Sequence, residues 1–324
     1  MISVSVKGRG IKSPPSHFFN QNMDDLCAAV RRAVFRGMGM CQNSPPTRET
    51  ESVMVSTDHS FDGMADKFAQ NIYGTSKGKI RAAVVWQDLQ GCLSRLGDRP
   101  LRVLDAGGGF GYFAQQLAQM GHRVELCDLS ADMLELGRQQ IEAKGLSDRI
   151  RLIHCPIQDL DQHIEGEFDL ILCHAVLEWL SEPRQTLLSL LRFLAPGGIL
   201  SLLFYNRHAL LFQSLVVGNF DYIRAGLTKK RKQKLTPSNP QLPEEVYDWL
   251  QRGGLRLIGK TGVRVIHDYM RHKQDQTEKF DDLLQMEQRY CRQEPFVALG
   301  RYIHVMAQRP LPHADNSVFE KRMS

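Results

Sequence analysis

The chain has 324 residues, of which 42% are apolar and 24% are charged, and its formal net charge at pH 7 is +5. This composition predicts a globular protein with a sizeable core, and no apolar run reaches the roughly 18 residues that a membrane-spanning helix needs. The seven cysteines are scattered and form no CxxC pair, so neither a disulfide framework nor a zinc site is indicated. We therefore expect a soluble cytoplasmic protein with no membrane segment and no metal.

The first part of the chain differs from the rest. Residues 1–55 contain two Ser-Pro-Pro sequences and only one short stretch with helical periodicity. We expect 1–55 to be a poorly ordered or dispensable extension, followed by a folded domain over 56–310 and a short tail over 311–324.

Within the folded domain, helical periodicity over 61–96 predicts two helices ahead of the first strand. After Pro100, apolar strands alternate with helical stretches. This alternation predicts an α/β fold with a mostly parallel sheet and helices on both faces. The expected strands number seven and cover 101–106, 123–127, 150–154, 168–173, 199–205, 255–260 and 301–307.

The most informative motif follows the first of these strands, which ends in Asp105 and runs into Gly107 and Gly108. Glycines allow a ligand to approach the backbone closely, and the next helix begins with free N–H groups that face the ligand. The segment also fits a dinucleotide-binding motif, with Asp128 as the ribose-binding acid. Because the Asp105 carboxylate would repel a pyrophosphate but attract an ammonium and a sulfonium, we predict S-adenosylmethionine (SAM) as the cofactor. A nicotinamide dinucleotide stays the alternative.

Three further residues are candidates for the same site. Ile157 and Gln158 follow the third strand, where an adenine ring would lie, and His174 ends the fourth strand. Ligands of open α/β sheets bind at this carboxyl edge. The turn around Pro196, ahead of an apolar strand, is also common in SAM-dependent methyltransferases.

Longer sequence runs extend from about residue 61 to 307 and are more specific than the glycine motif. They are found at 67–68, 71–75, 103–109, 127–130, 174–179, 218–222, 259–265, 290–295 and 300–305. With these runs the chain resembles the tRNA 5-carboxymethoxyuridine methyltransferases, which are class I methyltransferases with a Rossmann-like fold and N-terminal cap helices. The segment 110–112 is less polar than is usual in that family, and 1–55 match nothing in it.

The resemblance implies SAM-dependent methyl transfer to the carboxylate of 5-carboxymethoxyuridine at the tRNA wobble position (U34), forming 5-methoxycarbonylmethoxyuridine. It also implies SAM contacts from Arg81, Gly107, Gly108, Asp128, Ile157, Gln158 and His174, to which the charge argument adds Asp105. The alternative acceptor is a small-molecule acid.

A carboxylate needs no general base, because with a pKa near 4 it is already ionised at neutral pH. It must instead be oriented in a dry site. No catalytic residue is certain, but Tyr205, Arg264 and Arg301 are candidates for orienting the carboxylate, although each could equally have a structural role.

A basic insertion near 228–240 carries five cations within six positions. In an arbitrary protein such a run is often a solvated loop. In a tRNA-modifying enzyme it would neutralise phosphates of the anticodon arm. The candidate RNA-binding residues are Lys229, Lys230, Arg231, Lys232 and Lys234.

Overall fold

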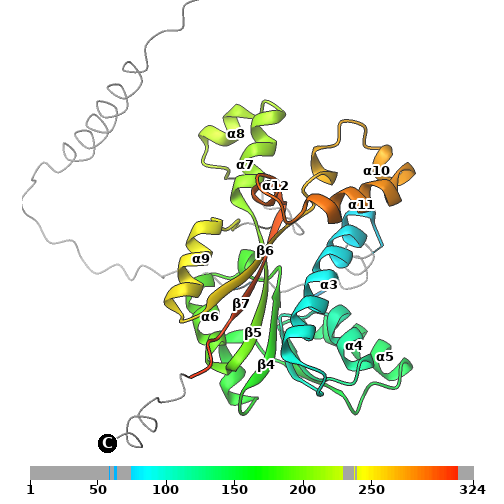
Figure 1. Ribbon diagram of the computed structural model, residues 1–324, viewed down its shortest axis with the longest axis vertical. Coiled ribbons are helices and arrows are strands. Elements are labelled where there is room, and N and C mark those ends of the chain that lie inside the picture. Colours follow the sequence, from blue (N-terminus) through cyan, green and yellow to red (C-terminus); the bar gives the residue numbers. More distant parts are fainter. Residues whose placement is uncertain (1–57, 59–61, 64–73, 229–236, 238, 313–324) are drawn as a thin grey trace, which may run out of the picture. The chain divides into compact units, whose positions relative to one another are not determined.

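The computed structural model describes residues 58, 62–63, 74–228, 237 and 239–312 (Figure 1). All of these residues belong to one compact unit, Val55–Ser324. Several expectations lie outside the described residues. They concern the extension 1–55, most of the first cap helix, the basic run 229–234 and nearly all of the tail.

A seven-stranded sheet with the strand order β3-β2-β1-β4-β5-β7-β6 forms the centre of the domain. Strands β1 to β5 are parallel, and β7 runs antiparallel to both of its neighbours, β5 and β6. The predicted mostly parallel, seven-stranded sheet is therefore confirmed. The strands are β1 Arg102–Ala106, β2 Arg123–Asp128, β3 Ile150–His154, β4 Phe168–His174, β5 Leu194–Tyr205, β6 Arg256–Val263 and β7 Tyr302–Gln308.

Helices cover both faces of the sheet, with α3, α4 and α5 on one side and α6 and α9 on the other (Figure 1). In the part of the chain that the structure describes, no helix is both long and apolar enough to cross a bilayer. The α-helices are α3 Ser76–Leu96, α4 Tyr112–Gln119, α5 Ala131–Ala143, α6 Pro183–Leu190, α7 Arg207–Val216, α8 Phe220–Arg224, α9 Pro243–Arg252, α10 Asp275–Glu278, α11 Phe280–Tyr290 and α12 Phe296–Leu299. The short 3₁₀ turns are η1 Ile157–Gln162, η2 Leu177–Trp179, η3 Leu191–Phe193 and η4 His267–Tyr269.

The central strands are buried on both faces, which explains why their sequences are apolar throughout. In β1, Val103 packs with α3, α4 and α5, whereas Leu104 packs with η1, α6 and α9 on the opposite face. Leu170 and Ile171 of β4 alternate in the same way. Successive side chains of a strand point to opposite faces, so each strand contributes to two cores.

Local capping fixes where two site-bearing helices begin. The Thr75 side chain accepts a hydrogen bond from the Gly78 backbone at the start of α3, and Ser130 does the same for Met133 at the start of α5. Such caps satisfy backbone donors that the first helical turn leaves unpaired. The α3 cap positions the first two helix turns, which carry Lys77 and Arg81.

The backbone packing between β6 and β7 leads to a stability prediction. A Cβ at Gly300 would lie 2.5 Å from Gly262 Cα, 2.6 Å from the Tyr302 carbonyl oxygen and 2.7 Å from the Val263 nitrogen. These are all backbone atoms, so we expect Gly300→Ala to lower the free energy of unfolding by about 1–3 kcal/mol, as overpacking does. Urea unfolding measures this change.

The matched control is Gly91→Ala in α3, because a Cβ there meets nothing within 4 Å. This exposed helical glycine should gain about 0.5–1 kcal/mol of stability on replacement. An unchanged unfolding midpoint for Gly300→Ala would contradict the close backbone approach at this position.

Candidate active site

A pocket of about 420 Å³ opens at the carboxyl ends of the central strands. Its walls come from the turn after β1, the ends of β2 and β4, the segment after β3, the first turns of α3, single residues of β5 and β7, and the residue after β6. The sheet order changes direction between β1 and β4, and open α/β sheets bind ligands at such a switch point. The volume suits a small organic ligand.

The glycine turn after β1 forms one wall of this pocket. The backbone nitrogens of Gly107 and Gly108 both donate to the Cys127 carbonyl of β2, at 2.8 and 3.1 Å. Gly107 has a φ of +73°, and a Cβ there would lie 2.6 Å from a Val176 methyl group. A Cβ at Gly108 would lie 2.6 Å from the carboxyl carbon of Asp105. Larger residues are therefore excluded at both positions, and a ligand can reach the backbone.

Two carboxyl groups make this end of the pocket acidic. Asp128 lines the pocket and accepts hydrogen bonds from the backbone of Gly109 at 2.8 Å and of Ser130 at 2.9 Å. Burial raises the pKa of Asp128 above its usual value despite these bonds. Burial, with the nearby charge of Asp128, raises the pKa of Asp105 to about 7. Placing a cation here would relieve the cost of these buried charges.

Asp105 differs from the other predicted cofactor residues in its location. Its side chain is 4% exposed and lies behind Gly108, and it is not among the pocket-lining residues. Its charge can therefore act on a ligand through space, but its carboxyl group does not form part of the wall.

The other predicted cofactor residues all line the pocket: Arg81, Gly107, Gly108, Asp128, Ile157, Gln158 and His174. Arg81 projects from α3, and its guanidinium lies 5.8 Å from the centre of the Tyr302 ring. Lys77, one turn earlier, also lines the pocket, although the sequence analysis did not select it. The α3 side of the pocket is therefore cationic and faces the acidic glycine turn.

Asp58 is a second pocket residue that the sequence analysis missed. Its carboxylate accepts from Gln158 Nε2 at 2.7 Å and from the Ser181 backbone at 2.8 Å. Gln158 also donates to Thr186 at 3.2 Å, so its amide is fixed in orientation. No sequence signal identifies Asp58, because its partners lie at least 100 residues away.

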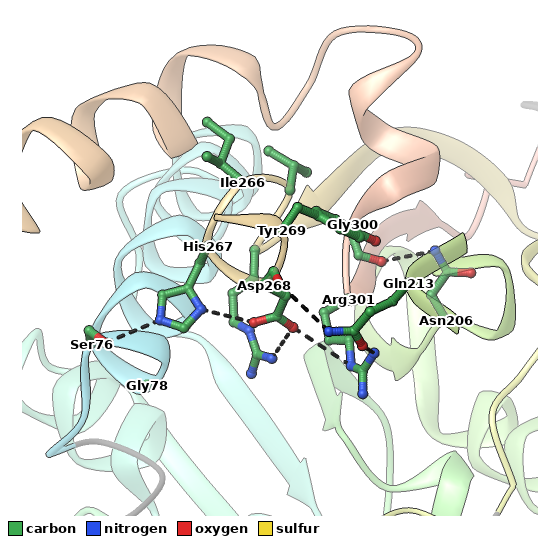
Figure 2. A network of polar contacts seen from close by, with 12 residues as sticks. Ser76, Gly78, Asn206, Gln213, Ile266, His267, Asp268, Tyr269, Gly300 and Arg301 are labelled. Carbon is green, nitrogen blue, oxygen red and sulfur yellow. Dashed lines mark hydrogen bonds and ion pairs between the residues drawn. The ribbon is translucent and has the colours of Figure 1, made fainter. Parts of the chain in front are cut away.

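Arg264 lines the pocket on the side of β6 and belongs to a buried ionic cluster (Figure 2). Asp268 is the centre of this cluster. It forms a salt bridge with Arg264, accepts from His267 Nδ1 at 2.9 Å and lies 3.7 Å from Arg301 Nε. Burial alone would raise the pKa of Asp268, but the bonds and charges of His267, Arg264 and Arg301 outweigh this effect and hold the pKa well below its usual value.

The backbone at Arg264 is strained, and hydrogen bonds to a buried glutamate fix the residues that follow it. Arg264 has a φ of +64°, which is uncommon for a residue with a side chain. The fully buried Glu287 of α11 accepts hydrogen bonds from the next three backbone nitrogens, those of Val265, Ile266 and His267, at 2.8 to 3.0 Å. Strain of this kind persists only where the surroundings fix it, and it is concentrated at functional sites.

The three residues that were predicted to orient a carboxylate differ in their position relative to the pocket. Only Arg264 lines the pocket, and its buried Nε atom has no hydrogen-bond partner among the described residues. Tyr205 is 3% exposed and packs against Tyr302, with ring centres 5.5 Å apart. Arg301 lies 4.9 Å from the centre of the Tyr205 ring and donates to Gln213 at 2.5 Å. Tyr205 and Arg301 thus lie behind the wall that Arg264 forms.

No group of three or more His, Cys, Asp or Glu side chains within the described ranges is arranged to hold a metal ion. The predicted RNA-binding run, Lys229 to Lys234, lies outside these ranges.

Comparison with known proteins agrees with this architecture. Residues 104–202 match the family model of a methyltransferase domain. The tRNA 5-carboxymethoxyuridine methyltransferase of Escherichia coli (strain K12) is 54% identical over 253 residues, which are 78% of this chain and 97% of that protein. The ubiquinone biosynthesis O-methyltransferase of Psychrobacter cryohalolentis is 31% identical over 117 residues, 36% of this chain and 46% of that protein.

Among solved structures, magnesium protoporphyrin IX methyltransferase from Synechocystis PCC 6803 with bound SAH superposes with a TM-score of 0.50. It is 16% identical and covers 77% of this chain and 96% of its own. At this identity the likeness concerns the fold.

The sheet order, the glycine turn at its switch point and the matching domain define a class I SAM-dependent methyltransferase. At 54% identity over nearly the whole length of the Escherichia coli protein, the chain belongs to the family of tRNA 5-carboxymethoxyuridine methyltransferases.

The raised pKa of Asp105 predicts how cofactor affinity depends on pH. Below about pH 7 the carboxyl of Asp105 is largely protonated, whereas a cationic sulfonium and ammonium favour its ionised form. Binding at about pH 6 should therefore release a proton, and SAM affinity should rise up to about tenfold between about pH 6 and about pH 7.5. Calorimetry in two buffers with different ionisation enthalpies measures both effects.

Asp105→Asn should abolish the pH dependence and bind SAM more weakly near pH 7.5. Equal wild-type affinity at both pH values, without proton release, would show that Asp105 does not couple to the cofactor.

Proposed function

We propose that the chain transfers the methyl group of SAM to the carboxylate of 5-carboxymethoxyuridine at the wobble position (U34) of tRNA, forming 5-methoxycarbonylmethoxyuridine. The name of the 54% identical Escherichia coli relative, tRNA 5-carboxymethoxyuridine methyltransferase, supports this acceptor. The structural observation that carries the proposal is the buried Nε–H donor of Arg264 at the pocket wall, which has no hydrogen-bond partner among the residues that the structure describes.

The charges of the Arg264 cluster favour an anionic acceptor. Arg264 and Arg301 contribute two guanidinium groups, and among the described residues Asp268 is the one carboxylate that is ion-paired with them. A buried guanidinium is costly unless it is paired with an anion. A guanidinium is also suited to a carboxylate, because its planar set of donors matches two carboxylate oxygens. Of the two arginines, we assign the direct contact to Arg264, with Arg301 and Tyr205 supporting it.

In this proposal the residues around the glycine turn hold the cofactor. Gly107 and Gly108 give access to the backbone, Asp128 takes the ribose hydroxyls, and Ile157 and Gln158 lie beside the adenine. Arg81 provides a cation for the methionyl carboxylate. SAM supplies an electrophilic methyl group, and the carboxyl groups at the glycine turn attract its positive sulfonium.

The reaction needs no acid or base from the protein. A carboxylate with a pKa near 4 is already ionised, so an oxygen lone pair forms the new bond to the methyl carbon while the electrons of the sulfur–methyl bond remain on sulfur. No proton moves. Burial raises the pKa of Tyr205 to about 12, so its phenol stays neutral during the reaction. The protein contributes orientation and exclusion of water.

The neutral product explains how the acceptor can leave. A methyl ester carries no charge, so its attraction to the Arg264 cluster is much weaker than that of the carboxylate. The cluster therefore distinguishes substrate from product by charge.

Recognition of tRNA is assigned to the basic insertion near 228–240, whose basic run, Lys229 to Lys234, lies outside the described residues. Its cations would neutralise phosphates of the anticodon arm. The preceding α7 and α8 carry exposed apolar side chains, including Val216, Val217 and Phe220 at 64%, 69% and 52% exposure. An aromatic ring such as Phe220 can stack on an unpaired base. A tRNA substrate also agrees with a cytoplasmic location.

Replacing Arg264 by Lys keeps the charge but removes Nε–H and the forked geometry. Since a hydrogen bond to a charged group contributes about 1.5–3 kcal/mol, we expect kcat/KM for tRNA to fall roughly 10- to 100-fold. SAM affinity measured by calorimetry should stay nearly unchanged. The control is Arg256→Lys, at an exposed position that begins β6. Full activity of the Arg264 variant would exclude a direct role for Arg264.

The acceptor itself is tested by nucleoside mass spectrometry of tRNA from a strain that lacks the gene. We expect 5-carboxymethoxyuridine to accumulate and its methyl ester to disappear, and the intact gene to restore the ester. A gene encoding glutamates at Lys229, Lys230 and Arg231 should restore little of it, because the phosphate contacts are reversed in sign. An unaltered nucleoside profile in the deletion strain would exclude tRNA as the acceptor, leaving a small-molecule acid.

A further inference from the structure

A line of hydrogen-bonded polar side chains runs through the core from α3 to the pocket. Asp88 Oδ2 lies 2.7 Å from His304 Nδ1, His304 Nε2 lies 2.7 Å from Ser201 Oγ, and Ser201 Oγ lies 2.8 Å from His174 Nε2. Asp88, Ser201 and His304 are at most 3% exposed. His174 lines the pocket at the end of β4.

The position of this line argues that it has a function. Ser201 interrupts the apolar run of β5, and His304 lies in β7 among residues buried on both faces. Buried polar groups cost stability unless all of them are paired, and apolar side chains would fill these places at less cost. Within the described residues every member is paired except at its last atom, His174 Nδ1, which is buried and has no hydrogen-bond partner.

The ionised state of Asp88 determines the direction of each hydrogen bond in this line. Arg292 donates to Asp88 Oδ1 through Nε at 2.9 Å and Nη2 at 2.6 Å. Burial alone would raise the pKa of Asp88, but His304 and Arg292 outweigh this effect and keep it below its usual value. Asp88 is therefore an acceptor, and His304 Nδ1–H donates to it. Because Arg292 already balances the charge of Asp88, a neutral His304 leaves the buried line without net charge.

The positions of the protons on Ser201 and His174 follow from this assignment. A neutral His304 with its proton on Nδ1 has an acceptor at Nε2, so the Ser201 hydroxyl donates to it. The Ser201 oxygen in turn accepts from His174 Nε2–H. His174 is also held neutral, since burial together with the nearby charge of Arg81 lowers its pKa well below the usual value. Its proton is therefore on Nε2, and Nδ1 carries a free lone pair.

We propose that Asp88, His304 and Ser201 are positioning residues that hold His174 in its Nε2–H tautomer, so that Nδ1 accepts a hydrogen bond from the methionyl ammonium group of SAM. The ammonium is the donor that fits this side of the pocket. His174 lies near Arg81, the proposed partner of the methionyl carboxylate, whereas Asp128 and Gln158 lie on the β2 and β3 side. The proposal rests on the cofactor and is independent of the methyl acceptor.

The tautomer can be observed directly in the cofactor-free protein by ¹⁵N-detected histidine spectra. We expect His174 Nδ1 to have the shift of an unprotonated ring nitrogen and Nε2 that of an N–H. In Ser201→Ala, which removes the acceptor for Nε2–H, the two tautomers should mix. A proton on Nδ1 in the wild-type protein would overturn the proposal, and this measurement does not depend on whether the variant folds.

The ligand part of the proposal is tested by calorimetry with S-adenosylhomocysteine and with an analogue that lacks its α-amino group. Loss of one hydrogen bond should weaken S-adenosylhomocysteine binding to Ser201→Ala roughly 3- to 10-fold and leave binding of the deaminated analogue unchanged. Equal weakening of both ligands would mean that Ser201 only shapes the pocket, and would overturn the assignment to the ammonium.

The matched control is Ser214→Ala. Ser214 is also a buried serine, but its hydroxyl donates to the Leu210 carbonyl within α7 at 2.8 Å. Both ligands should bind this variant as they bind the wild type. A loss as large as that of Ser201→Ala would show that the effect is not specific to the line that ends at His174.

Discussion

The side of the pocket that we propose for the methyl acceptor depends on the neutralisation of one buried carboxylate. Asp268 is paired with Arg264 and His267 and lies close to Arg301, and an unpaired charge at this depth would cost several kcal/mol. These partners come from the residue after β6, from η4 and from the residue before β7. His267 also bonds Ser76 at 3.1 Å, at the start of the helix that bears Arg81. The same carboxylate thus connects the acceptor side with the cofactor side (Figure 2).

The two ends of the pocket have opposite charges, and this arrangement suits a reaction between an anion and a cation. Asp105 and Asp128 lie at the glycine turn, whereas Arg264 directly follows β6. A cationic methyl donor and a carboxylate would each find a complementary wall. Between the walls, the two reactants attract each other in a site of low polarity, where such attraction is strongest.

The sequence predicted what depends on local patterns. Strand periodicity identified all seven strands, and the glycine motif identified the pocket wall after β1, because a strand, its turn and the next helix are neighbours in the chain. Helices α7, α8 and α9 were not anticipated. Asp105 was placed at the ligand, but the turn folds its carboxyl behind Gly108. Glu287 and His304 could not be selected, since only the folded chain brings their partners close.

The position of the antiparallel strand β7 in the sheet affects the order in which the protein folds during synthesis. β7 lies between β5 and β6, so β6 cannot join the sheet until the ribosome has produced residues about 40 positions later. Domains begin to fold from the N-terminal side during synthesis, and β1 to β5 are complete by Tyr205. A growing chain can therefore build its glycine turn long before Arg264 and Arg301 reach their places. The proposed carboxylate site is therefore complete only after its last strand has been translated.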